Sequence, residues 1–191
     1  MFPVSRETED RLRCYVGCLR QWNAAINLMS ARDLISIWPR HIQDGLALAS
    51  LYADRPGTAA DIGSGAGIPG LIAAIASDRP VTLVESDRRK AAFLTEAARV
   101  TQAPVTVLAT RAEDCGLTSQ AVISARALAP LTRLLAVCQP MLGQAGHALL
   151  FKGQDADLEI EEAEHAFRFD IVRHLIGTSL ILEISNLTSR P

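Results

Sequence analysis

The sequence predicts an α/β fold, a doubly wound and mostly parallel sheet of about seven strands preceded by a helical extension. Short runs of β-branched and apolar residues alternate with longer runs at helical spacing, which is the pattern of strands joined by helices. Parallel strands can pair side by side only through crossover connections of this length. The stretch DIGSGAGIPG, residues 61–70, also places four glycines after the first expected strand, where doubly wound sheets bind ligands.

The chain divides into a helical extension, residues 1–56, and an α/β domain, residues 57–191. Within the extension, residues 5–26 and 31–53 carry apolar side chains at helical spacing, so we expect one helix over each range. Pro56-Gly57 then breaks the helical pattern. We expect the extension to pack on the α/β domain, because apolar helix faces need a partner.

The α/β domain is expected to alternate strands with helices as far as residue 152. The expected strands are residues 58–62, 81–85, 105–110, 121–125 and 147–152, and the expected helices are residues 69–77, 87–101 and 131–141. The acidic stretch 155–164 is interpreted as one solvated helix. Two last apolar stretches, 167–175 and 179–186, are joined by Gly177-Thr178, which predicts an antiparallel hairpin at the sheet edge and a reversed last strand.

Composition excludes several classes of protein. The chain has 191 residues and is 49% hydrophobic, which favours one globular domain over a disordered chain. Its net charge of -2 argues against a dedicated nucleic-acid binder, because such domains usually carry a basic balance. No run approaches the roughly 20 apolar residues of a membrane span, and the acidic residues near the start do not fit a signal peptide. We expect a cytoplasmic protein with no membrane partner.

The cysteines give no metal signature. Cys14, Cys18, Cys115 and Cys138 show neither CxxC spacing nor neighbouring histidines in a ligand pattern. Cys14 and Cys18 lie one helical turn apart, which is half a metal site or, as we prefer, two small residues facing the core. We predict reduced thiols and no metal.

The glycine-rich stretch allows two kinds of ligand. Residues 65–70 satisfy GxGxxG, and Glu85 follows Gly65 at the distance of a ribose-binding acid, as in NAD-dependent oxidoreductases. However, Asp61 would bring a carboxylate close to a pyrophosphate, and the chain has no room for a second catalytic domain. Asp61, Glu85 and Glu113 follow the first three strands and are expected to converge. Three acids favour a neutral adenosine with a zwitterionic tail and a sulfonium, which is S-adenosyl-L-methionine.

The chain resembles a known family. The segments WNAAINLMS, RHIQDGL, DIGSGAGIPG, LVESDRRKAAFL, TRAED, ISARALAPL and FKGQ follow one another, from about Gln21 to Gly153, as in the ribosomal RNA small subunit methyltransferase G family, also called glucose-inhibited division protein B. The resemblance implies a class I S-adenosylmethionine-dependent methyltransferase fold, which is Rossmann-like. It also implies transfer of a methyl group to N7 of a guanosine in 16S ribosomal RNA, free or in the small ribosomal subunit. We expect a monomer.

The resemblance also implies site residues. Its cofactor-binding positions correspond to Gly63, Ile68, Ala112, Glu113 and Arg126, and the fold in general places an acid such as Glu85 at the ribose. Gly45 stands where this family usually has serine.

Basic residues near the crevice are expected to contact RNA. The candidates are Arg40, His41, Arg89, Lys90 and again Arg126. The alternatives are a structural hydrogen bond for the Arg40-His41 pair and solvated positions in a first helical turn for Arg89 and Lys90.

No catalytic acid or base is expected. Guanine N7 carries a free lone pair, so methylation removes no proton beforehand. His41, His147, His165 and His174 stand in unlike contexts, with no triad spacing. Two other functions stay open from the residues alone: an NAD-dependent oxidoreductase, and a non-catalytic RNA-binding assembly factor built on a methyltransferase fold.

Overall fold

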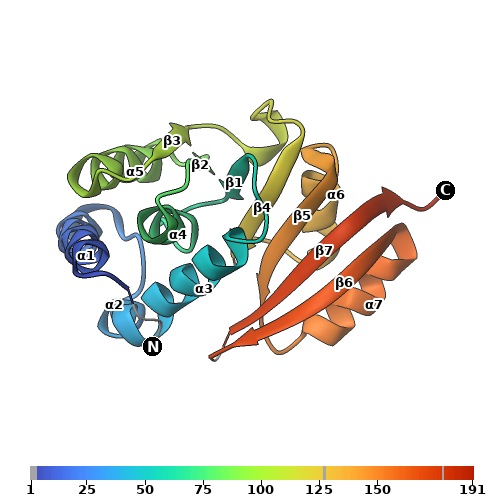
Figure 1. Cartoon of the computed structure of the whole chain (residues 1–191), viewed down its shortest axis with the longest axis horizontal. Coiled ribbons are helices and arrows are strands. Elements are labelled where there is room, and N and C mark those ends of the chain that lie inside the picture. The colour runs from blue at the N-terminus through green and yellow to red at the C-terminus, as the bar shows by residue number, and fades with distance from the viewer. Residues whose placement is uncertain (1–3, 127, 178) are drawn as a thin grey trace.

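A seven-stranded sheet forms the centre of this computed structural model, which describes residues 4–126, 128–177 and 179–191. The strands are β1 (Ala59–Ile62), β2 (Val81–Val84), β3 (Val105–Leu108), β4 (Gln120–Arg126), β5 (Leu142–Lys152), β6 (Phe167–Ile176) and β7 (Ser179–Ser189). Their order is β3-β2-β1-β4-β5-β7-β6 (Figure 1). β3, β2, β1, β4 and β5 pair in parallel, and all four residues of β1 are buried, as expected for a strand covered on both faces.

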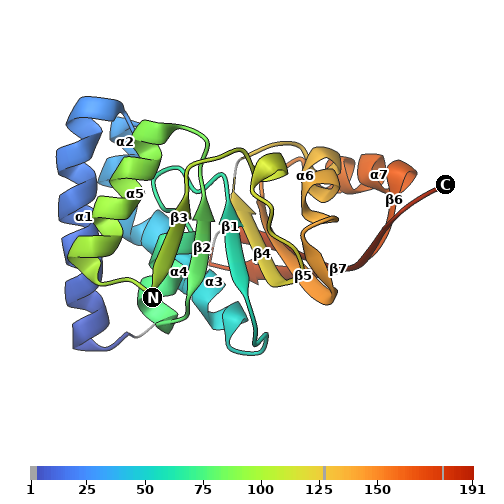
Figure 2. The same ribbon diagram turned by 90° about the horizontal axis from the view of Figure 1, so that it is seen from above.

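Helices cover both faces of the sheet, which confirms the predicted doubly wound fold. One core contains apolar residues of α1 (Arg6–Ile26), α3 (Gln43–Tyr52), α4 (Gly70–Ser77) and α5 (Arg88–Thr101). A second core contains those of α6 (Leu131–Cys138) and α7 (Ala156–Ala166). Figure 2 shows α6 and α7 across the sheet from α3 and α4. The carboxyl ends of β1 and β4 therefore meet where the chain changes faces, the usual ligand-binding point of this architecture.

The first helix of the extension is joined to the α/β domain by polar contacts as well as by its apolar face. Ser5 caps α1 by accepting a hydrogen bond from the amide of Thr8. The buried hydroxyl of Tyr15 donates to the carbonyl of Ala66, 2.7 Å away in the glycine-rich loop. Figure 1 and Figure 2 both show α1 beside α5. The extension thus contacts the candidate ligand loop directly.

The expected single helix over residues 31–53 is wrong. The segment forms α2 (Ala31–Ile35), a π-helical segment (Ile37–Ile42) and then α3. Pro39 lies inside the π-helical segment, and because proline has no amide hydrogen, the regular ladder cannot pass through it. This segment contains one buried polar side chain, His41, and the first turn of α3 adds another, Asp44.

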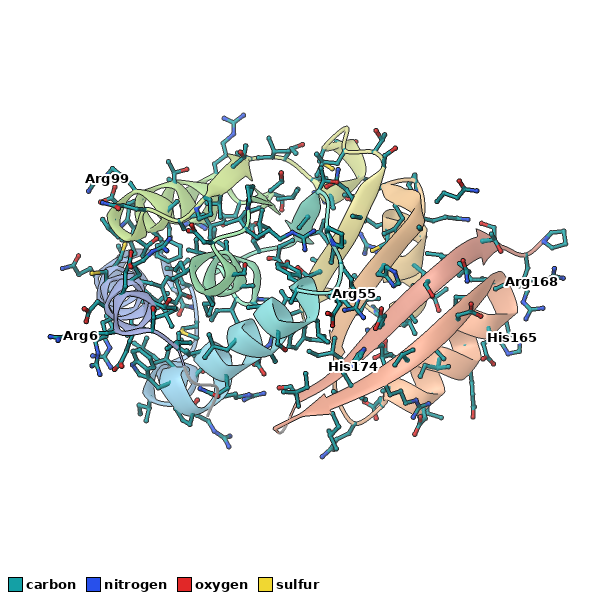
Figure 3. All side chains as sticks on the ribbon, viewed as in Figure 1. Arg6, Arg55, Arg99, His165, Arg168 and His174 are labelled. Carbon is teal, nitrogen blue, oxygen red and sulfur yellow. The ribbon has the colours of Figure 1, made fainter. Side chains whose placement is uncertain are left out.

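The last two strands confirm the predicted antiparallel hairpin and reversed last strand. β7 runs antiparallel to both β5 and β6 and lies between them. The expected turn Gly177-Thr178 falls partly outside the described residues, because Thr178 is not among them. Buried Glu183 on β7 accepts hydrogen bonds from Arg55 and His174, whose side chains are labelled in Figure 3.

None of the helices in the described part of the chain is both long and apolar enough to cross a membrane. No group of three or more His, Cys, Asp or Glu side chains within it has an arrangement suited to holding a metal ion.

Candidate functional site

The glycine-rich loop joins β1 to α4 and is held against the end of β2. The amides of Gly63 and Ser64 both donate to the carbonyl of Val84, at 2.8 and 3.1 Å. Gly63 has φ +67°, a left-handed conformation that glycine adopts without steric cost. A Cβ at Gly63 would lie 2.6 Å from Cδ1 of Leu128. A side chain at residue 63 would therefore have to displace Leu128.

Glu85 follows β2 and braces this loop. Its Oε2 accepts from the amide of Gly65 and its Oε1 from the amide of Asp87, both at 2.8 Å. A carboxylate has about four lone-pair positions, so these two bonds leave capacity for a ligand hydroxyl. Glu85 is 6% exposed and stays a candidate for the ribose contact.

Asp61 does not join the other two acids in the crevice, so the expected convergence of three carboxylates is wrong for this residue. Its side chain is 1% exposed, and its Oδ1 accepts from the hydroxyl of Ser124 at 2.6 Å. The backbone of Gly70 covers it, since a Cβ there would lie 2.6 Å from Asp61 Oδ2. Burial raises the pKa of Asp61 to about 6, against the lowering effect of the Ser124 hydrogen bond.

A cavity of about 130 Å³ lies at the carboxyl ends of the first strands. Three of the expected cofactor positions border it: Gly63, Ala112 and Glu113. Ala112 and Glu113 belong to a 3-10 turn, Ala112–Asp114, that follows β3. We call this space the smaller cavity; its other walls include Val84, Ser86 and Leu128.

A larger cavity of about 950 Å³ adjoins it and shares Leu128 and Ala129 with it. It lies at the carboxyl ends of β4 and β5. Its walls carry both signs of charge, from Arg40, Arg126, Lys152, Asp155, Glu159 and Glu162.

The remaining cofactor positions, Ile68, Glu85 and Arg126, do not line the smaller cavity. Ile68 is half-buried against the first apolar core and lines neither cavity. Arg126 lines the larger cavity and forms an ion pair with Asp44 of α3. Burial lowers the pKa of Arg126, and the carboxylate of Asp44 opposes this effect. The structure thus brings Gly63, Ala112 and Glu113 together at the smaller cavity, and Ile68, Glu85 and Arg126 lie outside its walls.

Asp44 was missed in the sequence although it lies within RHIQDGL. It is 3% exposed, and its second carboxylate oxygen accepts from the hydroxyl of Ser179, at the start of β7. A carboxylate three residues after the Arg40-His41 pair is a weak sign of an ion pair, because nothing local identifies its partner. Ser179 gave no signal of any kind.

Arg40 and His41 differ in their surroundings. Arg40 is exposed, lines the larger cavity and lies 3.5 Å from a carboxylate oxygen of Asp33. His41 is 6% exposed, which argues against the expected RNA contact, but its Nε2 lies 3.4 Å from Asp33 Oδ1 and neither ring nitrogen has a hydrogen-bond partner among the described residues, so the structural hydrogen bond is not seen for His41 either. Burial and the nearby guanidinium of Arg126 lower the pKa of His41.

Arg89 and Lys90 lie in the first turn of α5 and line neither cavity. The exposed guanidinium of Arg89 lies 3.1 Å from Asp87, which also caps the helix. Hydrogen bonds from Arg89 lower the pKa of Asp87 to about 2. These positions agree with solvated residues of a first helical turn.

The acidic helix α7 is not simply solvated, which corrects that interpretation. Glu159 Oε2 lies 2.6 Å from both Lys152 Nζ and the amide of Leu131, the first residue of α6. The side chain of Lys152 is 6% exposed. One face of α7 thus forms part of the wall of the larger cavity.

Comparison with known proteins gives a consistent result. A family model described as rRNA small subunit methyltransferase G matches residues 8–187. A ribosomal RNA small subunit methyltransferase G from Gluconobacter oxydans is 52% identical over 163 residues, covering 85% of this chain and 84% of the relative. One from Paracoccus denitrificans is 43% identical over 189 residues, covering 96% and 97%.

Solved structures with low identity support the fold alone. A ribosomal protein L11 methylase from Lactobacillus delbrueckii subsp. bulgaricus has a TM-score of 0.62 at 22% identity, covering 76% of this chain and 78% of that one. A tRNA (m1A58) methyltransferase from Aquifex aeolicus has a TM-score of 0.58 at 11% identity, covering 74% and 67%.

Proposed function

The chain belongs to the rRNA small subunit methyltransferase G family, and from that membership we propose how its two cavities carry out the reaction. The protein transfers a methyl group from S-adenosyl-L-methionine to N7 of a guanosine in 16S ribosomal RNA. This assignment decides against the oxidoreductase and against the non-catalytic assembly factor.

The observation that carries the proposal is the shared wall of the two cavities at Leu128 and Ala129. We assign the smaller cavity to the cofactor nucleoside, with Gly63 allowing close approach, Ala112 and Glu113 at the adenine and Glu85 at the ribose. Half-buried Ile68 would stabilise the conformation of the glycine-rich loop by packing against the first apolar core. We assign the larger cavity to the target guanosine. A cofactor in one cavity and a base in the other would then be neighbours.

Bound S-adenosyl-L-methionine supplies an electrophilic methyl group on a positively charged sulfur. The protein's own residues have to align that methyl with the N7 lone pair and exclude water. Because N7 carries no proton, no side chain is needed as a base. Positioning of this kind contributes up to about 7–11 kcal/mol of barrier lowering. The buried hydrogen bonds of Glu85 and the packing around Gly63 support a rigid cofactor loop.

Recognition of the RNA is assigned to basic groups at the larger cavity. Arg40 is exposed at its wall and suited to a phosphate, and Arg126 lies deeper. Arg89 and Lys90 would act only by attraction at a distance. We further propose that the protein acts in the cytoplasm, as a monomer and without a metal ion, on 16S RNA either free or in the small ribosomal subunit.

Transfer of labelled methyl from S-adenosyl-L-methionine to small-subunit RNA from a strain lacking the endogenous enzyme tests the proposal. Label should appear as 7-methylguanosine; its absence from both free RNA and intact subunits would refute the assignment.

A variant at the smaller cavity and a control variant beside it test the assignment of that cavity to the cofactor. Glu113→Ala should weaken cofactor binding roughly 10-fold or more, since a hydrogen bond from the ligand to a charged carboxylate is lost. Asp114→Ala, next to it and outside the smaller cavity, should leave binding within about 2-fold in calorimetry, a factor worth less than about 0.5 kcal/mol.

A further inference from the structure

We infer that Asp44 is a positioning residue, which fixes the guanidinium of Arg126 at the wall of the larger cavity with help from Ser179. The inference rests on the proposed function, in which the larger cavity holds the target guanosine. We call these three residues the Asp44 clamp. They come from α3, the end of β4 and the start of β7, so the clamp joins the helical extension, the parallel sheet and the terminal hairpin.

Both carboxylate oxygens of Asp44 are committed within the clamp. Oδ2 accepts from Nη1 of Arg126, and Oδ1 accepts from the hydroxyl of Ser179. Nδ1 of His41 lies 3.9 Å from Oδ2 on the other side. Asp44 is 3% exposed, and both of its carboxylate oxygens are hydrogen-bonded, so its side chain is held in one position.

Arg126 keeps donors for a ligand. A guanidinium has five N–H donors, and in the described part of the chain the hydrogen bonds of Arg126 engage Nη1 alone. Its side chain is 16% exposed and borders the larger cavity. A free arginine side chain samples many rotamers, whereas one pinned at Nη1 presents its remaining donors in fixed directions.

The chemistry of the target selects what these donors recognise. Arginine usually binds guanine through both O6 and N7, but N7 must stay free here because it attacks the methyl group. Arg126 is therefore assigned to an RNA oxygen, either guanine O6 or a neighbouring phosphate oxygen. Both are acceptors that a fixed positive donor recognises.

A double-mutant cycle with Asp44→Asn and Arg126→Gln tests the clamp. Each single change should lower kcat/KM for RNA by roughly 10- to 100-fold, the size expected for a lost charge-assisted hydrogen bond. The double variant should be no worse than the poorer single variant, because Asp44 acts through Arg126. The Kd for S-adenosyl-L-methionine, measured for the same variants, separates a role of Arg126 at the RNA from the cofactor contact that the family resemblance implies for it. Additive losses in kcat/KM, or a loss confined to cofactor binding, would overturn the inference.

The control carboxylate is Glu96, which pairs with Arg99 at 2.7 Å on α5 and lines neither cavity. Glu96→Gln should keep kcat/KM within about 3-fold, whereas loss of a clamp bond costs more. If Asp44→Asn does not fold, Arg126→Lys replaces it, since lysine keeps the charge but cannot bind Asp44 and present directed donors together. Wild-type kcat/KM for Arg126→Lys would equally overturn the clamp.

Salt dependence separates the two RNA oxygens. If Arg126 contacts phosphate, Arg126→Gln should reduce the slope of log affinity against log salt by about 0.7–0.9. If it contacts O6, the slope should stay unchanged while affinity falls. Affinity and slope that both match the wild type would refute an RNA contact. Wild-type protein that binds the cofactor and transfers no methyl group would instead refute the proposed function, whatever the cycle gives.

Discussion

The carboxylate of Asp61 lies directly beneath Gly70, the first residue of α4, so that a Cβ on Gly70 would lie 2.5 Å from Asp61 Cγ. A negative charge at this place faces the positive end of the helix dipole, which favours it. The charge is also fully buried, and its Oδ2 has no hydrogen-bond partner among the described residues. Burial is the larger effect, because the pKa of Asp61 is raised to about 6.

Asp61→Asn should stabilise the protein above pH 6. The folded state prefers a protonated Asp61, so its contribution to stability falls as the pH rises from about 4 to about 6 and is then constant. The rise in pKa corresponds to on the order of 3 kcal/mol at neutral pH. Asparagine keeps an oxygen for Ser124 without the charge.

Urea unfolding of both proteins at pH 5 and pH 8 measures this effect. The stability difference between Asp61→Asn and the wild type should grow from pH 5 to pH 8. A variant less stable than the wild type at pH 8 would mean that the helix dipole outweighs burial.

Gly63→Ala should weaken cofactor binding without unfolding the protein. The new methyl group would displace Leu128, a flexible side chain at the shared wall, into the space assigned to the ligand. Gly116→Ala is the matched control, because Gly116 has φ +69° against +67° for Gly63 and open space around it. Both changes should cost about 1–2 kcal/mol of stability from left-handed strain.

Calorimetric titration with S-adenosyl-L-methionine separates these two variants. We expect Gly63→Ala to bind the cofactor at least about 10-fold more weakly than the wild type, a loss of about 1.4 kcal/mol. Gly116→Ala should bind it with the wild-type affinity. Equal cofactor affinities in the two variants would show that the ligand does not approach Gly63.

Gly45→Ala should destabilise the fold by about 1–3 kcal/mol or more, the cost of overpacking a core. A Cβ at Gly45 would lie 2.4 Å from Cβ of Ile72, a fully buried residue of α4. α3 and α4 are therefore too close here for a side chain at residue 45. Gly17→Ala is the control: it is exposed in α1 with open space, and alanine should stabilise that helix by about 0.5–1 kcal/mol. Opposite shifts in Tm are expected, and a shared sign would contradict the packing argument.

Glu183→Gln should cost about 3–5 kcal/mol by leaving the guanidinium of Arg55 without its charge partner. Burial alone would raise the pKa of Glu183, but hydrogen bonds from Arg55 and His174 hold it below its ordinary value. Its stabilising effect is therefore complete above about pH 4.5 and is lost as the pH falls through the lowered pKa. Thermal unfolding at pH 7 measures the loss of stability. The substitution should leave cofactor affinity unchanged, because Glu183 lines neither cavity. A variant as stable as the wild type would show that Arg55 finds another partner.

Local pattern was enough for most of the fold and for part of the site. Hydrophobic periodicity located the strands and most helices, and the glycines located the loop, because both signals lie within short stretches of sequence. The π-helical segment around Pro39 was missed, since proline predicts an interruption but not its form. The Asp44 clamp was beyond local reasoning, because its residues are 82 and 135 positions apart. The burial of Asp61 depended on how α4 sits above β1, which no spacing in the sequence specifies.

Because Tyr15 of the helical extension donates a hydrogen bond to Ala66 of the α/β domain, we do not expect the boundary near residue 56 to separate two independent units. A shortened chain that starts at residue 57 would leave the carbonyl oxygen of Ala66 without its donor, and it would expose the face of α5 that packs on α1. We therefore expect cofactor binding to require the first helix, even though no residue of that helix lines either cavity.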